Sequence, residues 1–524
     1  MLLELESPPT QVRTRSSVLW LTVFGGIGVA LLILQAIDYI NFAVDDVFIT
    51  LRVAQNAADG LGLVYNAGEW VEGYSNFLWT VMIAGIAKVA GTSYAEPYTL
   101  MWVAKGLSFV AGLGTLFLVY RVAKLRMRSA FFSLLTVLAL IGTGSFVLWM
   151  CGGLEGTFYA MLLTATILLL EKYRQTTDTK YFAYLGVVLF LASITRPEVL
   201  MHSGAMLLVI LFSVAKQDRK ALIIKTLIPY GVLMAAFFAW RWFTYNDLLP
   251  NTFYAKTTGG LKSYVLGIKY LLAGMIFIAG PFILAIPLTI ARGIKSDITV
   301  RASLALIAST AFFVSYSSGD WMAGFRFIMP LAPILMLFGM EAIKSIAGKI
   351  DLSNRAAMTS LALVTVIILS GMVFAARQMV RGSIQTMPTG YSQITGHSVG
   401  WHEEIGNWFK HNTDGKRTIA TGEAGMIAYL NPNMRVIDLY GLLDHYIAHT
   451  KKKKLPLDAN YLFNQKPDYI LLYGSGAAAT VVSFSHNSSD FPSVVATSPR
   501  FAQEYQLKKH FISMDMFERK PDLQ

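Results

Sequence analysis

The sequence predicts a polytopic α-helical membrane protein with about 11 transmembrane helices and a C-terminal α/β domain outside the membrane. Of its 524 residues, 54% are hydrophobic and 15% are charged, whereas soluble domains carry about 25% charged residues. Crossing a bilayer takes roughly 20 apolar residues, and apolar segments of about this length recur over residues 1–377. Basic residues gather in the short loops between them, a positive-inside pattern that excludes nucleic acid as the partner despite a net charge of +12.

The first span, near residues 18–38, follows Arg13 and Arg15. It is too long for a signal-peptide core, so we interpret it as an uncleaved anchor with the N-terminus in the cytoplasm. The other predicted spans lie near residues 99–120, 130–150, 156–171, 181–195, 199–215, 222–243, 266–290, 300–317, 326–347 and 356–377. Residues 1–377 are therefore expected to form a transmembrane domain.

The apolar run Phe77–Ala90 decides the sidedness of everything that follows it. At ~1.5 Å per residue it reaches only ~21 Å, short of the ~30 Å hydrocarbon core. We expect it to lie along the membrane interface within a first outer loop, residues 39–98. If it spanned the membrane instead, every later loop would change sides. The interfacial interpretation places all strongly basic loops in the cytoplasm and the polar motif loops outside.

The C-terminal residues, 378–524, contain no spanning segment and are predicted to form a soluble exoplasmic or periplasmic domain. Strand-like runs occur at 417–420, 469–473 and 511–516, with a helix-like stretch at 401–410. Eleven spans with a cytoplasmic N-terminus place this domain on the outer side, like the motif loops.

Two adjacent carboxylates, Asp45 and Asp46, stand where the first span leaves the bilayer. Ionisable groups at a membrane edge are costly, which suggests function. Nucleotide sugars and ATP are absent outside the membrane, so an enzyme there needs a substrate activated by its lipid, such as a polyprenyl-phosphate sugar. One aspartate is expected to act as base or nucleophile, while the other orients a loop or a cation.

The remaining outer-loop residues supply the other groups that such chemistry needs. Cations must hold a phosphate whose charge grows as the bond breaks, and the predicted phosphate ligands are Arg52, Arg196, Lys256 and Arg326. Polar and aromatic side chains must hold the sugars, and the predicted contacts are Glu72, Tyr74, Asn76, Glu155, Asn251, Tyr254, Asp320 and Trp321. A structural ion pair is an equally good interpretation of Asp320 with Arg326 and of Arg196 with Glu198.

No metal site and no cofactor are predicted with certainty, although a divalent cation is compatible with the sequence. The single cysteine, Cys151, excludes an intrachain disulfide and a cysteine-based metal cluster. Asp438, Asp444 and His445 lie close together in the sequence, but we favour hydrogen bonding within a loop for them over metal ligation.

The motif loops resemble those of the bacterial terminal arabinofuranosyltransferase (AftB-like) family, which belongs to the GT-C glycosyltransferases. The likeness extends from the first span to about Gly441. It is carried by the motifs at residues 45–52, 62–66, 71–79, 249–256 and 319–327, and by residues 424–429 and 436–441.

This resemblance implies a GT-C-like fold in the bacterial cytoplasmic (inner) membrane, with a catalytic aspartate at the Asp45–Asp46 pair and a C-terminal domain that caps the cavity. It implies a polyprenyl-phosphate-linked sugar donor and a polysaccharide or lipid-glycan acceptor; in the arabinosyl case these are decaprenyl-phosphoryl arabinofuranose and an arabinan end. Inversion and retention both stay open. The alternatives are a transporter or flippase of a lipid-linked saccharide and a glycan-binding protein without catalysis. The absence of internal repeats counts against the transporter.

Overall fold

The computed structural model describes residues 15–256, 261–348, 367–378 without 369 and 376, 401–473, and 490–523 without 512. Most of the predicted eleventh span, 356–377, lies outside the described residues. The helices of the N-terminal part are α1 Arg15–Tyr39, α2 Asp45–Ala58, α3 Phe77–Ala90, α4 Pro97–Met127, α5 Ala130–Gly142, α6 Ser145–Met150, α7 Gly156–Thr176, α8 Lys180–Thr195, α9 Val199–Ser213, α10 Arg219–Leu222, α11 Ile228–Tyr245, α12 Asn251–Lys256, α13 Leu261–Ala279, α14 Ile286–Gly293, α15 Ile298–Tyr316 and α16 Ala332–Ala347.

The protein is a helical membrane protein. Six described helical segments are long and apolar enough to cross a membrane, namely Leu21–Tyr39, Pro97–Met127, Lys216–Tyr245, Ser263–Leu284, Ile298–Tyr316 and Met329–Ala347. Four shorter apolar helices, α3, α5, α8 and α9, accompany them. The count of eleven spans stays a prediction.

Some predicted spans are broken where the sequence carries a backbone signal. The segment near 130–150 divides into α5 and α6, because Gly144 between them adopts a φ of 64°. The segment near 266–290 likewise ends as α13 at Ala279, where Gly280 has a φ of 50° and Pro281 follows. A positive φ cannot continue a right-handed helix, and glycine adopts it at little cost.

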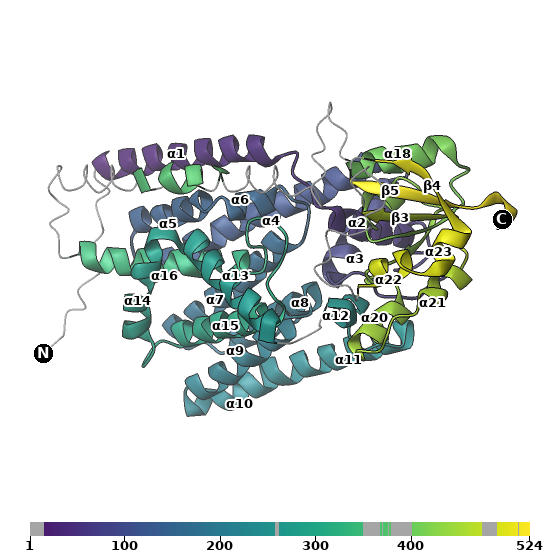
Figure 1. Cartoon of the computed structure of the whole chain (residues 1–524). Coiled ribbons are helices and arrows are strands. Elements are labelled where there is room, and N and C mark those ends of the chain that lie inside the picture. Colours follow the sequence, from purple (N-terminus) through teal and green to yellow (C-terminus); the bar gives the residue numbers. More distant parts are fainter. Residues whose placement is uncertain are drawn as a thin grey trace, which may run out of the picture.

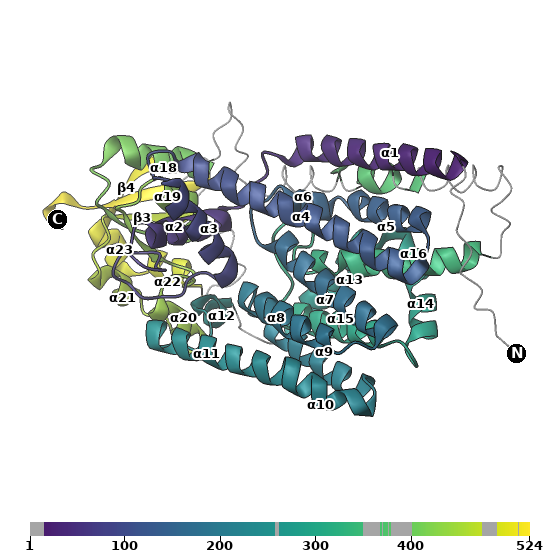
Figure 2. The ribbon, with the colours of Figure 1, turned by 180° about the vertical axis from the view of Figure 1, so that it is seen from behind.

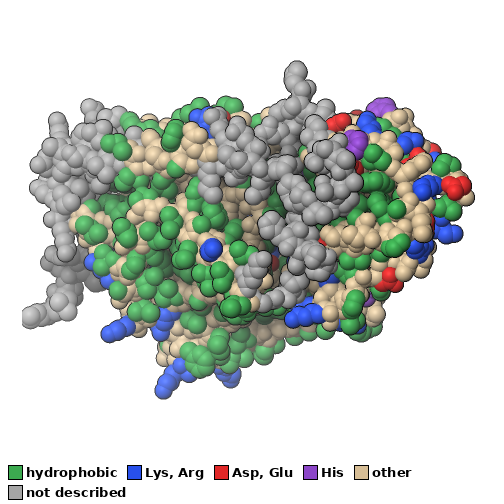
Figure 3. All heavy atoms as spheres, viewed as in Figure 1, with side chains coloured by type: hydrophobic (Ala, Val, Ile, Leu, Met, Phe, Trp, Pro, Cys, Tyr) green, Lys and Arg blue, Asp and Glu red, His purple; other side chains and the backbone are tan. Residues whose placement is uncertain are grey.

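Apolar side chains cover the outside of the helical part as well as its interior. Phe243 is 87% exposed, Val232 63% and Ile276 61%, which would be unfavourable in water but suits contact with lipid chains. The face in Figure 3 shows hydrophobic side chains over much of the helical half and charged side chains mainly toward the two ends.

The C-terminal part holds a mixed five-stranded sheet in the order β2-β1-β3-β5-β4. Its strands are β1 Thr418–Thr421, β2 Arg435–Asp438, β3 Tyr469–Tyr473, β4 Tyr505–His510 and β5 Met514–Arg519. Strands β1–β3 pair in parallel, and β5 is antiparallel to both β3 and β4. The surrounding helices are α18 Trp401–Asn412, α19 Met426–Tyr429, α20 His445–Lys452, α21 Ala459–Asn464, α22 Phe491–Ala496 and α23 Pro499–Glu504.

Helices α2, α3 and α12 lie between the long helices and this sheet, which occupies one end of the molecule (Figure 1). The view from behind shows the same order, with α2 and α3 beside the sheet (Figure 2). Ile49 and Val53 of α2 belong to one buried cluster with Ile405, Ile427 and Leu471 of the C-terminal part. The first outer loop therefore shares a hydrophobic core with the C-terminal residues, so its position depends on theirs.

Candidate active site

A cavity of about 790 Å³ opens between α2, the α8–α9 connection, α12 and the end of α15. Its polar wall consists of Asp46, Ser75, Arg196, Glu198, Thr252, Lys256, Asp320 and Arg326. Its apolar wall includes Leu200, Met201, Phe312, Phe313, Tyr316 and Phe327. A small adjoining recess shares Asp46, Lys256 and Arg326 with it and is also lined by Tyr74, Asn76 and Glu155. A cavity of this size, lined by both charged and apolar side chains, suits an amphiphilic ligand.

The two adjacent aspartates at the start of α2 face different surroundings. Asp46 lines both the cavity and the recess, and its carboxylate makes no hydrogen bond or ion pair with any residue that the structure describes. Asp45 is buried and accepts hydrogen bonds from the backbone N–H groups of Gly425 and Met426, at 2.7 and 2.8 Å. Asp46 is thus available to a ligand, while Asp45 attaches α2 to the loop after β1.

The two arginines of the cavity wall are already paired with carboxylates. Arg326 Nε donates to Asp320 Oδ2 at 2.8 Å, the ion pair considered for these residues from the sequence. Arg196 bonds both Glu198 and the buried Glu155. The ring of Phe327 lies beneath both guanidinium groups, 5.1 Å from Arg326 Cζ and 5.3 Å from Arg196 Cζ. This packing fixes the direction of the two positive charges.

The N–H groups left over define where an anion would bind. Both terminal nitrogens of Arg326 lack a hydrogen-bond partner among the described residues. Lys256 is exposed at the end of α12, lines the cavity, and forms no ion pair with the described part of the chain. Arg196 uses Nε and Nη1 in its two ion pairs, and its Nη2 has no hydrogen-bond partner among the described residues. Lys256, Arg326 and, with one free nitrogen, Arg196 therefore offer N–H groups to an anion in the cavity.

Glu155 and Asn76 form the floor of the recess. Asn76 Nδ2 donates to Glu155 Oε2 at 2.8 Å, and its Oδ1 accepts from Thr80 at 3.1 Å. Burial alone would raise the pKa of Glu155, but Arg196, Arg326 and this hydrogen bond lower it below its ordinary value. Glu155 is thus a buried anion that supports the cationic wall.

Two further predicted sugar contacts also lie at this site. Trp321 lines the cavity and is 43% exposed, so its ring is accessible to a sugar. Tyr74 lines the recess but is 2% exposed, and its hydroxyl is 3.0 Å from that of Tyr245.

Arg52, predicted to bind phosphate, lies outside the cavity. It is 2% exposed, and its guanidinium donates to the carbonyls of Tyr65, Ala428 and Met434 at 3.0, 2.6 and 2.6 Å. These bonds use its N–H groups to join α2 to the C-terminal residues. The placement gives Arg52 a structural role, which its position about two helical turns beyond the aspartates did not indicate.

Three of the predicted sugar contacts also lie away from the cavity lining. Glu72 is buried and forms an ion pair with Arg241 at 2.6 Å. Asn251 Nδ2 donates to the carbonyls of Gly441 and Leu442 at 2.9 and 3.0 Å, and Tyr254 packs its ring at 4.2 Å from that of His449. All three connect α12 or the first outer loop to neighbouring elements instead of facing the cavity. Arg241 was not considered from the sequence, since it lies inside an apolar span.

The structure adds residues that the sequence did not bring to the site. Ser75 and Thr252 line the cavity, and Glu198, considered only as a partner of Arg196, lines it too. Behind Asp45, His402 Nε2 lies 2.8 Å from Glu423 Oε2 and 3.9 Å from Asp45 Oδ1. Burial raises the pKa of Glu423 to about 7. These two residues come from α18 and the loop after β1, more than 350 positions from Asp45, so no local pattern pointed to them.

The pairing of Asp438 and Asp444 with loop backbone is confirmed. Asp438 accepts from the N–H groups of Tyr440 and Leu443, and Asp444 caps α20 by accepting from Ile447 N. His445 does not belong with them, because its imidazole faces Asp247.

Comparisons with known proteins support the predicted resemblance. The chain is 28% identical over 262 residues to the terminal beta-(1->2)-arabinofuranosyltransferase of Mycobacterium tuberculosis. This match covers 47% of the chain and 39% of that protein, so the chain spans about two fifths of the relative's length. A family model described as a domain of unknown function (DUF8728) matches residues 390–523.

Solved structures match over nearly the whole chain. ArnT from Cupriavidus metallidurans bound to undecaprenyl phosphate is 12% identical with a TM-score of 0.61, covering 97% of this chain and 99% of that one. The archaeal oligosaccharyltransferase AglB from Archaeoglobus fulgidus, in complex with an inhibitory peptide and a dolichol-phosphate, is 10% identical with a TM-score of 0.56, covering 88% of this chain and 70% of that one. The chain has the fold of these proteins, as a helical membrane protein.

Proposed function

We propose that this protein is a membrane glycosyltransferase that moves a sugar from a polyprenyl-phosphate donor to a cell-envelope glycan on the outer side of the cytoplasmic membrane. The observation that carries the proposal is the cavity whose lining combines the unpaired Asp46 with Lys256 and Arg326. A carboxylate, available cations and apolar side chains in one cavity are the groups that a lipid-phosphate sugar needs.

The donor is proposed to bind with its phosphate at Lys256 and Arg326 and its first prenyl units against Leu200, Phe312 and Tyr316. The likeness in fold to ArnT, whose structure contains undecaprenyl phosphate, and to AglB, whose structure contains a dolichol-phosphate, supports this class of donor. Charge-assisted hydrogen bonds from both cations stabilise the leaving phosphate as it gains charge.

Asp46 is proposed to act as the base. The acceptor hydroxyl oxygen bonds to the anomeric carbon of the sugar, the bond from that carbon to the phosphate oxygen breaks, and the hydroxyl proton passes to the Asp46 carboxylate. The products are a glycan extended by one sugar and the polyprenyl phosphate. This route inverts the anomeric configuration. A product with retained configuration would instead require a nucleophile, such as Asp46, or an ion-pair route.

Asp45 and Arg52 keep α2 fixed against the C-terminal residues, and so hold Asp46 in place without contacting substrate. The C-terminal residues are proposed to form an outer domain that caps the cavity, as the family resemblance implies. The sequence likeness to an arabinofuranosyltransferase makes arabinofuranose the first sugar to test.

The test uses a strain that lacks the gene, complemented with wild-type protein, Asp46→Asn or Asp59→Asn. Asp59 is the matched control, because it is exposed at the other end of α2 and lines neither the cavity nor the recess. We expect mass spectrometry of the envelope glycans to show one missing sugar in the deletion strain, restored by wild type and Asp59→Asn but not by Asp46→Asn. Full restoration by Asp46→Asn at equal protein level would refute the catalytic role of Asp46 and favour transport or glycan binding.

A further inference from the structure

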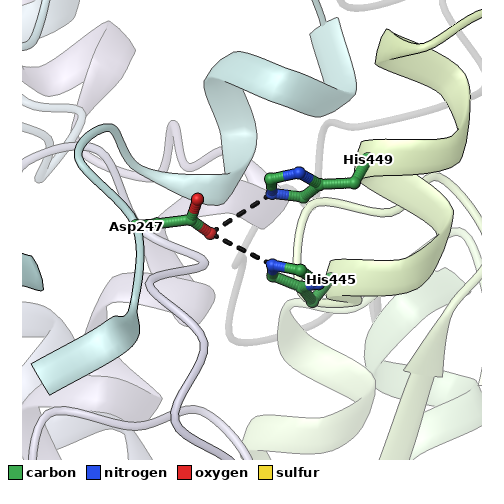
Figure 4. Close-up of side chains that lie close together, drawn as sticks. All are labelled: Asp247, His445 and His449. Atoms are coloured by element: carbon green, nitrogen blue, oxygen red, sulfur yellow. Dashed lines mark hydrogen bonds and ion pairs between the residues drawn. The ribbon is translucent and has the colours of Figure 1, made fainter.

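Three side chains outside the cavity converge where α11 ends and α20 begins. His445 and His449 are four residues apart on α20, which places both imidazoles on one face of that helix. Asp247, in the connection between α11 and α12, points between them (Figure 4). Its Oδ2 lies 3.3 Å from His445 Nε2 and 3.2 Å from His449 Nε2.

These distances match the edges of a tetrahedral coordination sphere. Ligands at 2.0–2.1 Å from a Zn²⁺ ion are roughly 3.3–3.4 Å apart when the geometry is tetrahedral. The three donor atoms all lie within 4.8 Å of one another. The three side chains thus already bring one donor atom each to a common point, as a shared ion requires.

The cluster also has the donor chemistry and access that a transition metal requires. Two imidazole nitrogens with one carboxylate suit Zn²⁺ or its first-row neighbours, whereas Ca²⁺ and Mg²⁺ prefer oxygen ligands. The His445 side chain is 52% exposed, so an ion can reach the site from solvent and a water molecule can complete its coordination.

We propose that Asp247, His445 and His449 form a site for a divalent transition metal such as Zn²⁺, which ties the α11–α12 connection to α20. The site lies apart from the cavity, since none of its three residues lines it. Helix α12 follows directly and carries Thr252 and Lys256 of the cavity wall. The metal is therefore a structural clamp whose loss loosens the element that carries Lys256.

The first experiment measures bound metal in full-length protein purified without a polyhistidine tag. After chelation, the protein is incubated with Zn²⁺, passed through a desalting column and analysed by elemental mass spectrometry. We expect His445→Ala/His449→Ala to hold one ion per chain fewer than wild type. His510→Ala is the control, because His510 pairs with Asp515 at 2.6 Å and belongs neither to this cluster nor to the other group of possible metal ligands among the described residues, Asp45, His402 and Glu423. This variant should bind as much metal as wild type does.

A second measurement does not depend on whether the double variant folds. Chelated wild-type protein is titrated with Co²⁺, which absorbs visible light strongly only in tetrahedral or similarly low-symmetry sites. We expect this absorption in wild type and its loss in Asp247→Asn. The proposal is overturned if wild type shows no such spectrum, or if the double variant retains as much metal as wild type. Both readouts are independent of glycosyl transfer, so they leave the proposed function untouched.

Discussion

Asp45 and Asp46 are adjacent and chemically identical, yet the structure predicts opposite consequences for the same substitution. Asp45→Asn replaces one acceptor oxygen by an NH₂ group that faces a buried backbone N–H. The two charge-assisted bonds to Gly425 and Met426 are each expected to contribute about 1.5–3 kcal/mol, and a neutral bond about 0.5–1.5 kcal/mol. One bond is lost and the other is weakened, so we expect Asp45→Asn to reduce the free energy of unfolding by about 2–4 kcal/mol.

Asp46→Asn should leave stability almost unchanged. The Asp46 carboxylate has no bonding partner in the described part of the chain, and substitutions at such positions usually change stability by less than about 0.5 kcal/mol. Its transfer activity should nevertheless fall by about 10²–10⁴-fold, which is the usual contribution of a general base.

The assay compares thermal unfolding of the two purified variants in detergent with the rate at which a protease cuts the C-terminal residues. Asp45→Asn should unfold at a lower temperature and be cut faster, yet keep wild-type transfer per folded molecule. Asp46→Asn should match wild type in both stability assays and lose transfer. The reverse pattern, with a stable inactive Asp45→Asn and a destabilised active Asp46→Asn, would refute the assignment of the two aspartates.

Three other perturbations test the role of Lys256, the packing of Gly425 against α2, and the titration of Glu423 and His402. Lys256→Met should lower kcat/KM for the lipid-phosphate donor about 10- to 100-fold, because a hydrogen bond from a cation to phosphate contributes about 1.5–3 kcal/mol; an unchanged kcat/KM would exclude Lys256 from phosphate binding. Gly425→Ala should make the C-terminal residues more sensitive to protease, because a Cβ there would lie 2.1 Å from a backbone oxygen of α2, whereas Gly204→Ala, with open space around it, should not. Raising the pH from 5 to 8 should lower the unfolding temperature. Burial raises the pKa of Glu423 from 4.5 to about 7. Burial alone would lower the pKa of His402, but the carboxylates of Asp45 and Glu423 raise it above its ordinary value. Both groups bind protons more tightly when folded, so their stabilisation is lost as the pH rises through the folded pKa values. A His402→Gln variant that shows the same slope would contradict this origin.

Local sequence patterns predicted most of the architecture. Hydropathy and helix-length arguments located every described long apolar helix, and strand patterns located β1 and β3 to within a residue. Both features depend on side chains close together in the chain, so a sequence reports them directly. The breaks at Gly144 and Gly280 were missed, because glycine also occurs inside helices and only the packed structure reveals a positive φ.

The sequence predicted which residue types the site contains, but not which of the motif residues line the cavity and which bind backbone elsewhere. The motif loops supplied Asp46, Lys256 and Arg326, all of which line the cavity. They also supplied Arg52 and Asn251, which bind carbonyls of residues 428–444. Nothing in a motif distinguishes a cation that faces a ligand from one that binds distant backbone oxygens, because that difference depends on tertiary contacts. The Asp247–His445–His449 cluster was missed for the same reason, since Asp247 lies about 200 residues before the two histidines.

The most direct test of the central claim is the release of polyprenyl phosphate by purified protein in lipid vesicles. A synthetic polyprenyl-phosphoryl sugar, beginning with decaprenyl-phosphoryl arabinofuranose, is supplied with envelope glycan as acceptor, and both products are quantified by mass spectrometry. We expect equal amounts of polyprenyl phosphate and extended glycan with wild type, and neither product with Asp46→Asn. Equal product formation by wild type and Asp46→Asn would contradict this expectation.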